Sequence, residues 1–312
     1  MFRLFYCDHH EVPLPPGHKF PMAKYRMVRE RLAAAGLFSF EPAPLADPAV
    51  IALIHNEEYV RRFIAGELPA AAQRRIGFPW SGGLVRRTLA SVGGTLGACG
   101  DALAKGWGGN LAGGTHHAAR AEGSGFCVFN DMAVAIAWLR SCGRIRRAAV
   151  VDCDVHQGDG TALLFEGDSD VFTLSLHGER NFPFRKQRSR VDIALPDATG
   201  DVEYLRALET ALPAVFEFQP EIVFYQSGVD GLRSDTLGRL SLSPEGLAAR
   251  DRMVISAART AGAPVVIVMG GGYARPIEDT AAAHARTFLA AAALYAPGAA
   301  SSSALNSILS VR

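Results

Sequence analysis

Apolar runs and helix-like segments alternate along this chain. Short runs of apolar residues, which are typical of buried strands, occur at 4–7, 148–151, 171–176, 222–225 and 265–269. Between them the hydrophobic positions have helical spacing, which predicts helices at 22–36, 57–66, 81–105, 131–139, 161–166, 202–218, 244–261 and 276–294. Residues 177–200 are expected to form a long loop. Strands that alternate with helices predict a mostly parallel central sheet with helices on both faces, which is an α/β fold of three layers, α/β/α.

The sequence shows no division into separate domains. Its 312 residues contain no internal repeat and no linker, so we expect one domain over 1–312 with a loosely held tail at 296–312. Four glycines, at 93, 94, 97 and 100, lie within the predicted helix 81–105 and would weaken that helix in isolation. They indicate that the helix packs very closely against its neighbours.

Composition and charge exclude several classes of protein. Hydrophobic residues make up 49% of the chain and charged residues 20%, as in ordinary α/β enzymes, and no apolar run is long enough for a membrane span. The first residues become polar too quickly for a signal peptide, so a cytoplasmic protein is expected. With 32 basic and 31 acidic residues the net charge is +1, which gives no reason to expect direct nucleic-acid binding. The basic stretch 185–190 is interpreted as ordinary surface, and nothing in the sequence predicts the oligomeric state.

Cysteine usage indicates free thiols. Five cysteines, at 7, 99, 127, 142 and 153, form no C-x-x-C pair and are odd in number. Cys127 and Cys153 have apolar neighbours, which favours a buried structural role over a catalytic one.

The strongest chemical signal directly follows the apolar run 148–151. Asp152, Asp154 and His156 lie two residues apart, and their side chains would project to one face if the extended backbone continued. Three such groups at the end of a buried strand would repel and desolvate one another, and a cation removes that conflict. Carboxylate and imidazole suit zinc or a similar divalent metal. The alternative interpretation is a polar strand end whose carboxylates cap a helix.

Other polar residues also follow predicted strands. Ligands of parallel α/β folds bind at the carboxyl ends of the strands, so these side chains are expected to converge there: His116, His117, Asp154, His156, Asp230 and Tyr273. A zinc held by Asp154, His156 and Asp230 would leave one position open, as in catalytic sites. The two histidines could then transfer protons, and Tyr273 could donate a hydrogen bond to an oxyanion. Taken singly, the histidines could be a packed pair, Tyr273 a loop anchor and Asp230 a helix cap. Phosphate-binding and serine-hydrolase signatures are absent from the sequence.

Four motifs resemble those of one enzyme family. They are Gly113-Gly114-Thr115-His116-His117, Gly125-Phe126-Cys127-Val128-Phe129-Asn130-Asp131, the stretch from Asp152 to Gly160, and Gly270-Gly271-Gly272-Tyr273. With them the chain closely resembles, from about residue 4 to 294, the zinc-dependent histone deacetylase-like amidohydrolases of the arginase/deacetylase fold. The stretches 18–22 and 237–243 are most similar to the class IV branch, including its bacterial members.

The resemblance implies roles for the catalytic residues. His117 would be the principal general base and acid, and His116 would be an electrostatic partner to the zinc-bound water. Asp152 and Asp159 would orient these two histidines, and Tyr273 would stabilise the oxyanion. Asp154, His156 and Asp230 would bind the zinc ion.

The resemblance also implies a narrow tunnel for the acyl-lysine substrate and a second metal. Gly125 and Phe126 would line the tunnel, with Phe182 and Phe184 both candidates for its opposite wall. Gly271 and Gly272 would let the loop before Tyr273 approach it closely. A structural potassium ion would be bound, partly through backbone carbonyls, by Asp152, Asp154, His156, Ser175 and Leu176.

The reaction expected from these features is hydrolysis of an N-acyl amide, most simply an acyl-lysine side chain of a peptide or protein. The class IV resemblance includes long fatty acyl groups among the expected substrates. A second hypothesis is hydrolysis of an acetylpolyamine or another small acylated amine, although the Arg-rich loops differ from the acidic mouth of such enzymes. A third is a non-catalytic module that binds acyl-lysine. The two-manganese chemistry of arginases is excluded, because Gln157 and Gly158 stand where that site needs carboxylates.

Overall fold

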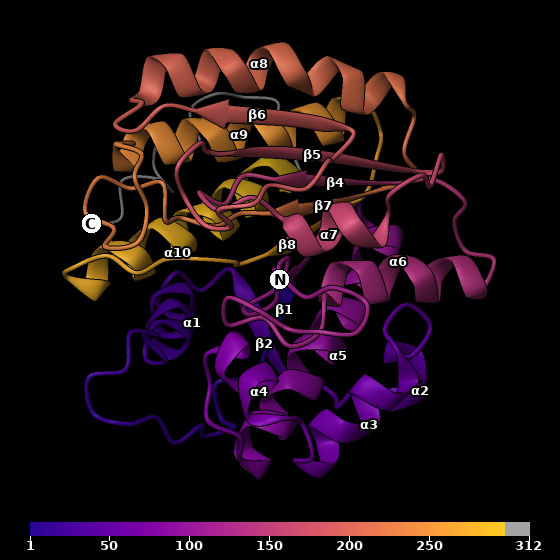
Figure 1. Cartoon of the computed structure of the whole chain (residues 1–312). Coiled ribbons are helices and arrows are strands. Elements are labelled where there is room, and N and C mark those ends of the chain that lie inside the picture. The colour runs from indigo at the N-terminus through magenta and orange to yellow at the C-terminus, as the bar shows by residue number, and fades with distance from the viewer. Residues whose placement is uncertain (297–312) are drawn as a thin grey trace.

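Eight parallel strands form one sheet through the middle of the protein in the computed structural model, which describes residues 1–296 (Figure 1). The strand order is β2-β1-β3-β8-β7-β4-β5-β6, and every neighbouring pair is parallel. The strands are β1 (Phe2–Tyr6), β2 (Phe38–Pro42), β3 (Trp107–Asn110), β4 (Ala148–Asp152), β5 (Val171–Gly178), β6 (Val191–Leu195), β7 (Ile222–Gln226) and β8 (Val265–Val268). The predicted loose tail lies, apart from its first residue, outside the described residues.

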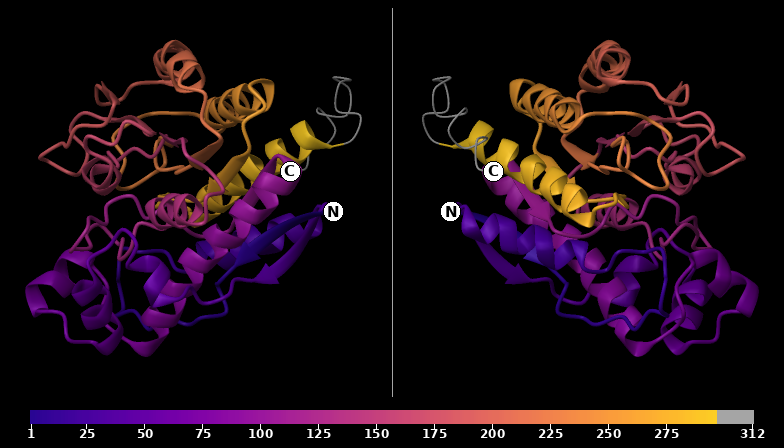
Figure 2. Two further views of the ribbon diagram at one scale, coloured as in Figure 1. Left: turned by 90° about the vertical axis from the view of Figure 1, so that its right-hand side faces the viewer. Right: turned by 90° about the vertical axis from the view of Figure 1, so that its left-hand side faces the viewer.

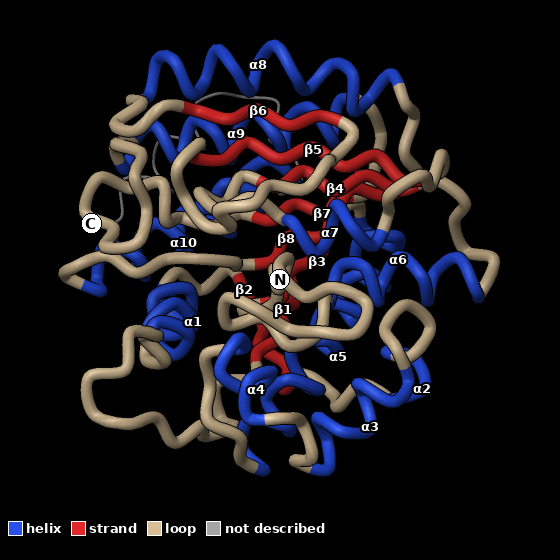
Figure 3. Tube along the Cα trace, in the orientation of Figure 1, coloured by secondary structure: helices blue, strands red, loops and turns tan. Residues whose placement is uncertain are grey.

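Helices cover both faces of this sheet (Figure 3). They are α1 (Lys24–Ala34), α2 (Pro48–Ile51), α3 (Glu57–Ala65), α4 (Ala70–Ile76), α5 (Gly82–Lys105), α6 (Asp131–Ser141), α7 (Asp159–Leu164), α8 (Asp201–Glu217), α9 (Pro244–Thr260) and α10 (Ile277–Tyr295). Helices α1, α10, α9 and α8 pack side by side in that order, and α5 packs against α6. In Figure 2, α8 (orange-red) lies at the top of both views and the purple segment that contains α3 and α4 lies at the bottom. No helix in the described part of the chain is both long enough and apolar enough to cross a membrane.

Two adjacent glycines of β3 show that α5 and α10 lie on opposite faces of the sheet. A Cβ atom at Gly108 would lie 2.0 Å from the carbonyl oxygen of Ala98 in α5. A Cβ atom at Gly109 would lie 2.9 Å from the ring of Phe288 in α10. Because successive residues of a strand point to opposite faces, these contacts confirm the predicted three-layer α/β/α arrangement.

The elements that the sequence did not predict lie mainly at the edges. Strands β2 and β6 are the two edge strands, and β6 falls inside the segment that was expected to be loop, 177–200. Their residues are partly exposed, so neither forms the apolar run typical of a buried strand. Helix α4 was also missed, and β3 precedes the residues 111–112 that were expected to lead into the Gly-Gly-Thr-His-His motif.

Candidate active site

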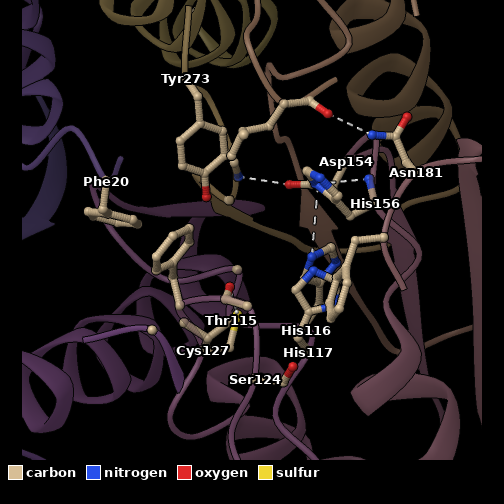
Figure 4. A pocket seen from close by; sticks show the side chains of 18 of the residues that line it. Phe20, Thr115, His116, His117, Ser124, Cys127, Asp154, His156, Asn181 and Tyr273 are labelled. Carbon is tan, nitrogen blue, oxygen red and sulfur yellow. Dashed lines mark hydrogen bonds and ion pairs between the residues drawn. The ribbon is translucent and has the colours of Figure 1, made fainter. Parts of the chain in front are cut away.

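A cavity of about 600 Å³ opens at the carboxyl ends of the strands. Its walls come from loops that are distant in sequence, as Figure 4 shows for several of the side chains. The lining residues are Phe20, Tyr25, Arg75, Ile76, Gly77, Gly113, Gly114, Thr115, His116, His117, Ser124, Gly125, Phe126, Cys127, Asp154, His156, Arg180, Asn181, Phe182, Phe184, Leu237, Arg239, Gly270, Gly271 and Tyr273.

The predicted metal ligands form a compact buried cluster at the floor of this cavity. One potential ligand atom each from Asp154, His156 and Asp230 lies within 4.8 Å of the other two. His156 Nδ1 is 3.0 Å from Asp154 Oδ1 and 3.1 Å from Asp230 Oδ2. Asp154 and Asp230 come from the loops after β4 and β7, which are neighbours in the sheet. The sequence therefore predicted a set of residues that the fold does bring together.

The route by which the backbone brings them together differs from the prediction. Strand β4 ends at Asp152 instead of continuing extended to His156. The carboxylate of Asp152 accepts a hydrogen bond from the Asp154 amide (3.1 Å), and Asp154 accepts one from the His156 amide (3.0 Å). Both are local side-chain to backbone bonds across two residues, which favour a turn over a strand. The backbone does not stay extended, so the condition for all three side chains to project from one face of a strand is not met.

Backbone amides and one glutamine fix the carboxylates of the cluster. Asp154 Oδ2 accepts hydrogen bonds from Gly271 N (2.7 Å) and Gln226 Nε2 (2.8 Å), and Asp230 Oδ1 accepts one from Val155 N (2.9 Å). A Cβ atom at Gly271 would lie 1.9 Å from Asp230 Oδ2, so only glycine fits beside the cluster. The ligand atoms are thus held in place by their surroundings.

The charges of the cluster suit a divalent cation. Asp154 and Asp230 are fully buried and share one imidazole. Burial and the charge of Asp154 raise the pKa of Asp230 to about 7. Burial also opposes the charge on Asp154, but His116 and the hydrogen-bonded His156 outweigh it and hold the pKa of Asp154 well below its usual range. Two carboxylates and an imidazole are ligands that suit zinc or a similar divalent metal, and a dication would neutralise both buried carboxylates.

His116 and His117 lie side by side, each with its own carboxylate. His116 Nδ1 is 2.7 Å from Asp152 Oδ2, and His117 Nδ1 is 2.6 Å from Asp159 Oδ1. Burial lowers the pKa of His116, but Asp152 and Asp154 together outweigh it and raise that pKa to about 9. Burial and the adjacent His116 lower the pKa of His117 to about 4. The two rings therefore differ in protonation, as proton donors and acceptors in one site commonly do.

Asp131 positions the turn that carries these histidines. Its carboxylate accepts hydrogen bonds from the amides of Gly114 (3.2 Å) and Thr115 (2.8 Å) and from the Thr95 hydroxyl (2.6 Å). A Cβ atom at Gly113, which has φ +76°, would lie 2.4 Å from the same carboxylate. The Gly-Gly-Thr sequence thus lets the backbone wrap around a buried acid on α6.

Tyr273 enters the cavity on the glycine-rich turn after β8. Figure 4 shows Tyr273 across the pocket from the His116–His117 pair, with Asp154 and His156 above that pair. Burial raises the pKa of the Tyr273 hydroxyl well above its usual value, so this hydroxyl keeps its proton at neutral pH. Lys24 holds the turn from behind, because its Nζ lies 3.1 Å from Gly270 O, 3.4 Å from Gly272 O and 5.1 Å from the centre of the Tyr273 ring.

Aromatic rings form the walls of the proposed tunnel. Phe126 packs against Phe20, with ring centroids 5.1 Å apart, and has the uncommon φ of +66°. Phe182 packs edge-on against His117 at 5.0 Å, whereas Phe184 is exposed. Of the residues predicted for the tunnel, only Gly272 is absent from the lining. A Cβ atom there would lie 2.6 Å from Thr280 Cγ2 and so points away toward α10.

The residues predicted to bind potassium lie around the ends of β4 and β5. Asp152 pairs with Ser175 in adjacent parallel strands, and the Ser175 hydroxyl contacts His177 Nδ1 at 3.0 Å. Potassium binding stays a prediction.

Three buried residues support the site without having been singled out in the sequence. Arg250 in α9 donates hydrogen bonds to the carbonyl oxygens of Cys153 (3.2 Å), Ser227 (3.2 Å) and Gly228 (2.6 Å), next to two metal-ligand loops. Lys24 and Gln226 have the contacts given above. Gln226 could have been identified from the sequence, because a side-chain amide at the end of a buried apolar strand needs a hydrogen-bond partner. Arg250 and Lys24 gave no such signal, because their partners next to the site are backbone carbonyls.

Comparisons with known proteins place these features in context. The sequence profile of the histone deacetylase domain matches residues 18–289. An uncharacterised protein of Picosynechococcus is 43% identical over 298 residues, which cover 94% of this chain and 99% of that protein. Histone deacetylase 2 of Arabidopsis thaliana is 39% identical over 199 residues, which cover 61% of this chain and 51% of that protein. The crystal structure of a histone deacetylase homologue from Aquifex aeolicus is similar with a TM-score of 0.77 at 26% identity, over 93% of this chain and 84% of that one.

Proposed function

Because the chain belongs to the histone deacetylase family, we propose that it is a zinc-dependent amidohydrolase that removes acyl groups from lysine side chains. One observation carries the proposal. One cavity is lined by Asp154 and His156 of the Asp-His-Asp cluster, by two histidines each bonded to a carboxylate, and by a tyrosine from another wall. Hydrolysis of an amide needs these parts: an electrophile, groups that accept and return a proton, and a donor to the developing oxyanion.

Asp154, His156 and Asp230 would hold the zinc ion. When bound, zinc would polarise the acyl carbonyl and make water more acidic. The fixed positions of the two carboxylates, each hydrogen-bonded by a backbone amide, support this assignment.

His117 is the proposed general base and acid. Its Nδ1 is bonded to Asp159, so Nε2 is the nitrogen left to accept a proton from water as the water oxygen attacks the carbonyl carbon. The same proton then passes to the amine nitrogen as the C–N bond breaks, which releases a carboxylate and a free amine. Asp159 stabilises the charge that His117 gains, and Asp152 holds the His116 ring in place. The Tyr273 hydroxyl donates a hydrogen bond to the carbonyl oxygen as it becomes negative.

The aromatic lining of the cavity supports an acylated alkyl amine as substrate. Phe126 and Phe182 would flank the alkyl chain of lysine between the surface and the site. The two stretches that resemble the class IV branch both reach the cavity, through Phe20 and through Leu237 and Arg239. We therefore include long fatty acyl groups in the proposed substrate range.

The test is an assay of the purified, zinc-loaded protein on acyl-lysine peptides from acetyl to myristoyl, beside N-acetylputrescine. Turnover of the peptides, lost in Asp154→Ala, supports the proposal, and the profile across chain lengths assigns the acyl group. Preference for N-acetylputrescine would overturn the lysine assignment in favour of small acylated amines. No turnover of any substrate despite bound zinc would overturn the proposal that the protein is an amidohydrolase.

A further inference from the structure

Positive charge gathers at the mouth of the cavity although the whole chain is nearly neutral. Three arginines, Arg75, Arg180 and Arg239, line the cavity, and Asp154 at its floor is the one carboxylate among the lining residues of the described chain. The net charge of the protein is only +1, so this local excess does not reflect a general one. The stretch 185–190, interpreted from sequence as ordinary surface, follows the Phe182 and Phe184 wall directly.

The arginines approach the mouth from two sides. Arg75 lies in α4, and its carbonyl oxygen accepts a hydrogen bond from Gly125 N (3.2 Å), which places it on the Phe126 wall. Arg180 directly precedes Asn181, and the side chain of Asn181 accepts a hydrogen bond from Arg239 N (3.2 Å). Figure 4 shows Asn181 across the pocket from Phe20, which packs on Phe126. An extended substrate lying over the mouth would therefore meet a guanidinium group on either side.

These guanidinium groups are available for a ligand. The side chains of Arg75, Arg180 and Arg239 are 57%, 72% and 54% exposed. Arg180 and Arg239 share the single carboxylate of Asp197, at 3.7 and 3.2 Å, so at least one positive charge on that side is unmatched. Arg75 pairs with the exposed Glu122 at 3.0 Å. Exposed ion pairs of this kind are weak and exchange partners readily.

Lys186 adds a further cation on the same side. Its Nζ donates hydrogen bonds to the carbonyl oxygens of Asn181 (2.5 Å) and Pro183 (2.7 Å). Among residues 1–296 it forms no ion pair within 4 Å, and the charges of Asp159 and Glu179 act on it from farther away. The wall that carries Phe182 is thus bounded by cations at both ends.

We propose that the mouth selects acyl-lysine within acidic segments of protein. Carboxylates a few residues from the acyl-lysine would form hydrogen-bonded ion pairs with Arg75, Arg180 and Arg239 while the acylated side chain fills the tunnel. An extended chain advances about 3.3–3.6 Å per residue, so side chains one to three residues away would reach the rim. Arginine suits this task because its planar group binds a carboxylate through two parallel hydrogen bonds. The inference rests on the proposed lysine deacylase function and names its substrate class.

The experiment compares three peptides that share one acyl-lysine and differ only in flanking residues, which are acidic, neutral or basic. The wild-type enzyme should hydrolyse the acidic peptide with a kcat/KM at least about tenfold above that of the basic one, since several exposed ion pairs each change affinity a few-fold. The difference should lie mainly in KM and shrink as salt rises from about 0.05 to 0.5 M, because screening shortens the range of these charges.

Variants locate the effect at the mouth. In the double variant Arg180→Gln/Arg239→Gln the ratio of acidic to basic kcat/KM should collapse toward one. The matched control is Arg26→Gln, which removes a similarly exposed arginine, paired with Glu30 at 3.7 Å on α1, and should keep the wild-type ratio.

Failure of this inference is distinguishable from failure of the proposed function. Equal kcat/KM on the three peptides, or preference for the basic one, overturns the acidic-substrate inference while leaving lysine deacylation intact. No turnover of any peptide overturns both. Competition by a short DNA duplex at physiological salt would overturn the inference in favour of nucleic acid as the occupant of the rim.

Discussion

Among single residues, Tyr273 offers the sharpest test of catalysis because one oxygen atom can be removed without changing the packing. In Tyr273→Phe the ring keeps its neighbours Phe20 and Phe126, at 6.1 Å from each. Loss of the hydroxyl should lower kcat by about 10²–10³, the usual value of one oxyanion donor, and leave KM nearly unchanged. Steady-state kinetics on an acyl-lysine peptide measure this. Unchanged kcat would contradict the proposed role, and a protein that only binds acyl-lysine would show equal peptide affinity and no turnover in either form.

The buried ring of His55 should make the stability of the protein depend on pH. This buried ring donates from Nδ1 to Ala119 O (2.9 Å), while its Nε2 accepts from Asn130 N–H (2.9 Å). A second ring proton would face the Asn130 N–H, and burial lowers the pKa of His55 to about 4. Because the folded pKa lies below the ordinary value of 6.5, the stability from His55 is complete above pH 6.5 and is lost as pH falls toward 4.

The His55 contribution across this range is about 3 kcal/mol, at 1.36 kcal/mol per pKa unit. Urea unfolding between pH 7 and 4 should show a shallower decline of the free energy of unfolding in His55→Gln than in the wild type. His9→Gln, which alters an exposed histidine, should keep the wild-type slope. An identical slope in the His55 variant would show that the ring is not the group that titrates.

The sequence identified the candidate metal ligands better than the residues that hold the surrounding loops in place. Asp154, His156 and Asp230 could be predicted because acids and imidazoles after apolar strands are unusual. Lys24 and Arg250 could not, because they bind backbone carbonyls 246 and 97 residues away along the chain. Such contacts have no residue pattern, and only the folded backbone reveals them.

Among the elements, the long helix α5 tests the prediction of close packing made from its glycines. A Cβ atom at Gly93 would lie 1.9 Å from the backbone oxygen of Pro44, whereas one at Gly100 would meet nothing within 4 Å. Gly93→Ala should therefore destabilise the protein by about 1–3 kcal/mol through overpacking. Gly100→Ala should be neutral or stabilise it by up to about 1 kcal/mol, since alanine is the better helix former. Urea unfolding of both variants compares them directly, and equal stability would refute the close contact.

Burial decided which elements could be predicted. The central strands β4, β7 and β8 are fully buried and form apolar runs, so their positions were found within about a residue. The edge strands β2 and β6 were missed because partial exposure leaves no such run. The turn after Asp152 could not be distinguished from a continued strand in the sequence, because the spacing of the acids alone fits both an extended chain and one folded by its own side-chain hydrogen bonds.

In the whole molecule, the site depends on the order of the central strands. Strands β4, β7 and β8 are neighbours, so the loops that follow them bring together residues up to about 120 positions apart: Asp154 and His156, Asp230, and Tyr273. The position follows the rule that ligands of such sheets bind at the carboxyl ends of the strands. A metal ion at this point would join two loops of the sheet and so contribute to the stability of the fold.

Metal removal should therefore lower the thermal stability of the protein. Without a cation, Asp154 and Asp230 are two buried carboxylates in contact with one imidazole, and zinc should stabilise the folded state by binding it selectively. At a free zinc concentration near 100 times Kd this amounts to about 2.7 kcal/mol, or a Tm rise of roughly 4 °C. Differential scanning calorimetry of chelator-treated protein, before and after zinc is restored, measures it. Asp230→Asn should remove most of the zinc-dependent rise in Tm. Its metal-free form should melt no lower than the metal-free wild type, because one of the two neighbouring negative charges is gone. Glu30→Gln, on the surface of α1, should keep the full rise. A full rise in Asp230→Asn would place the metal elsewhere.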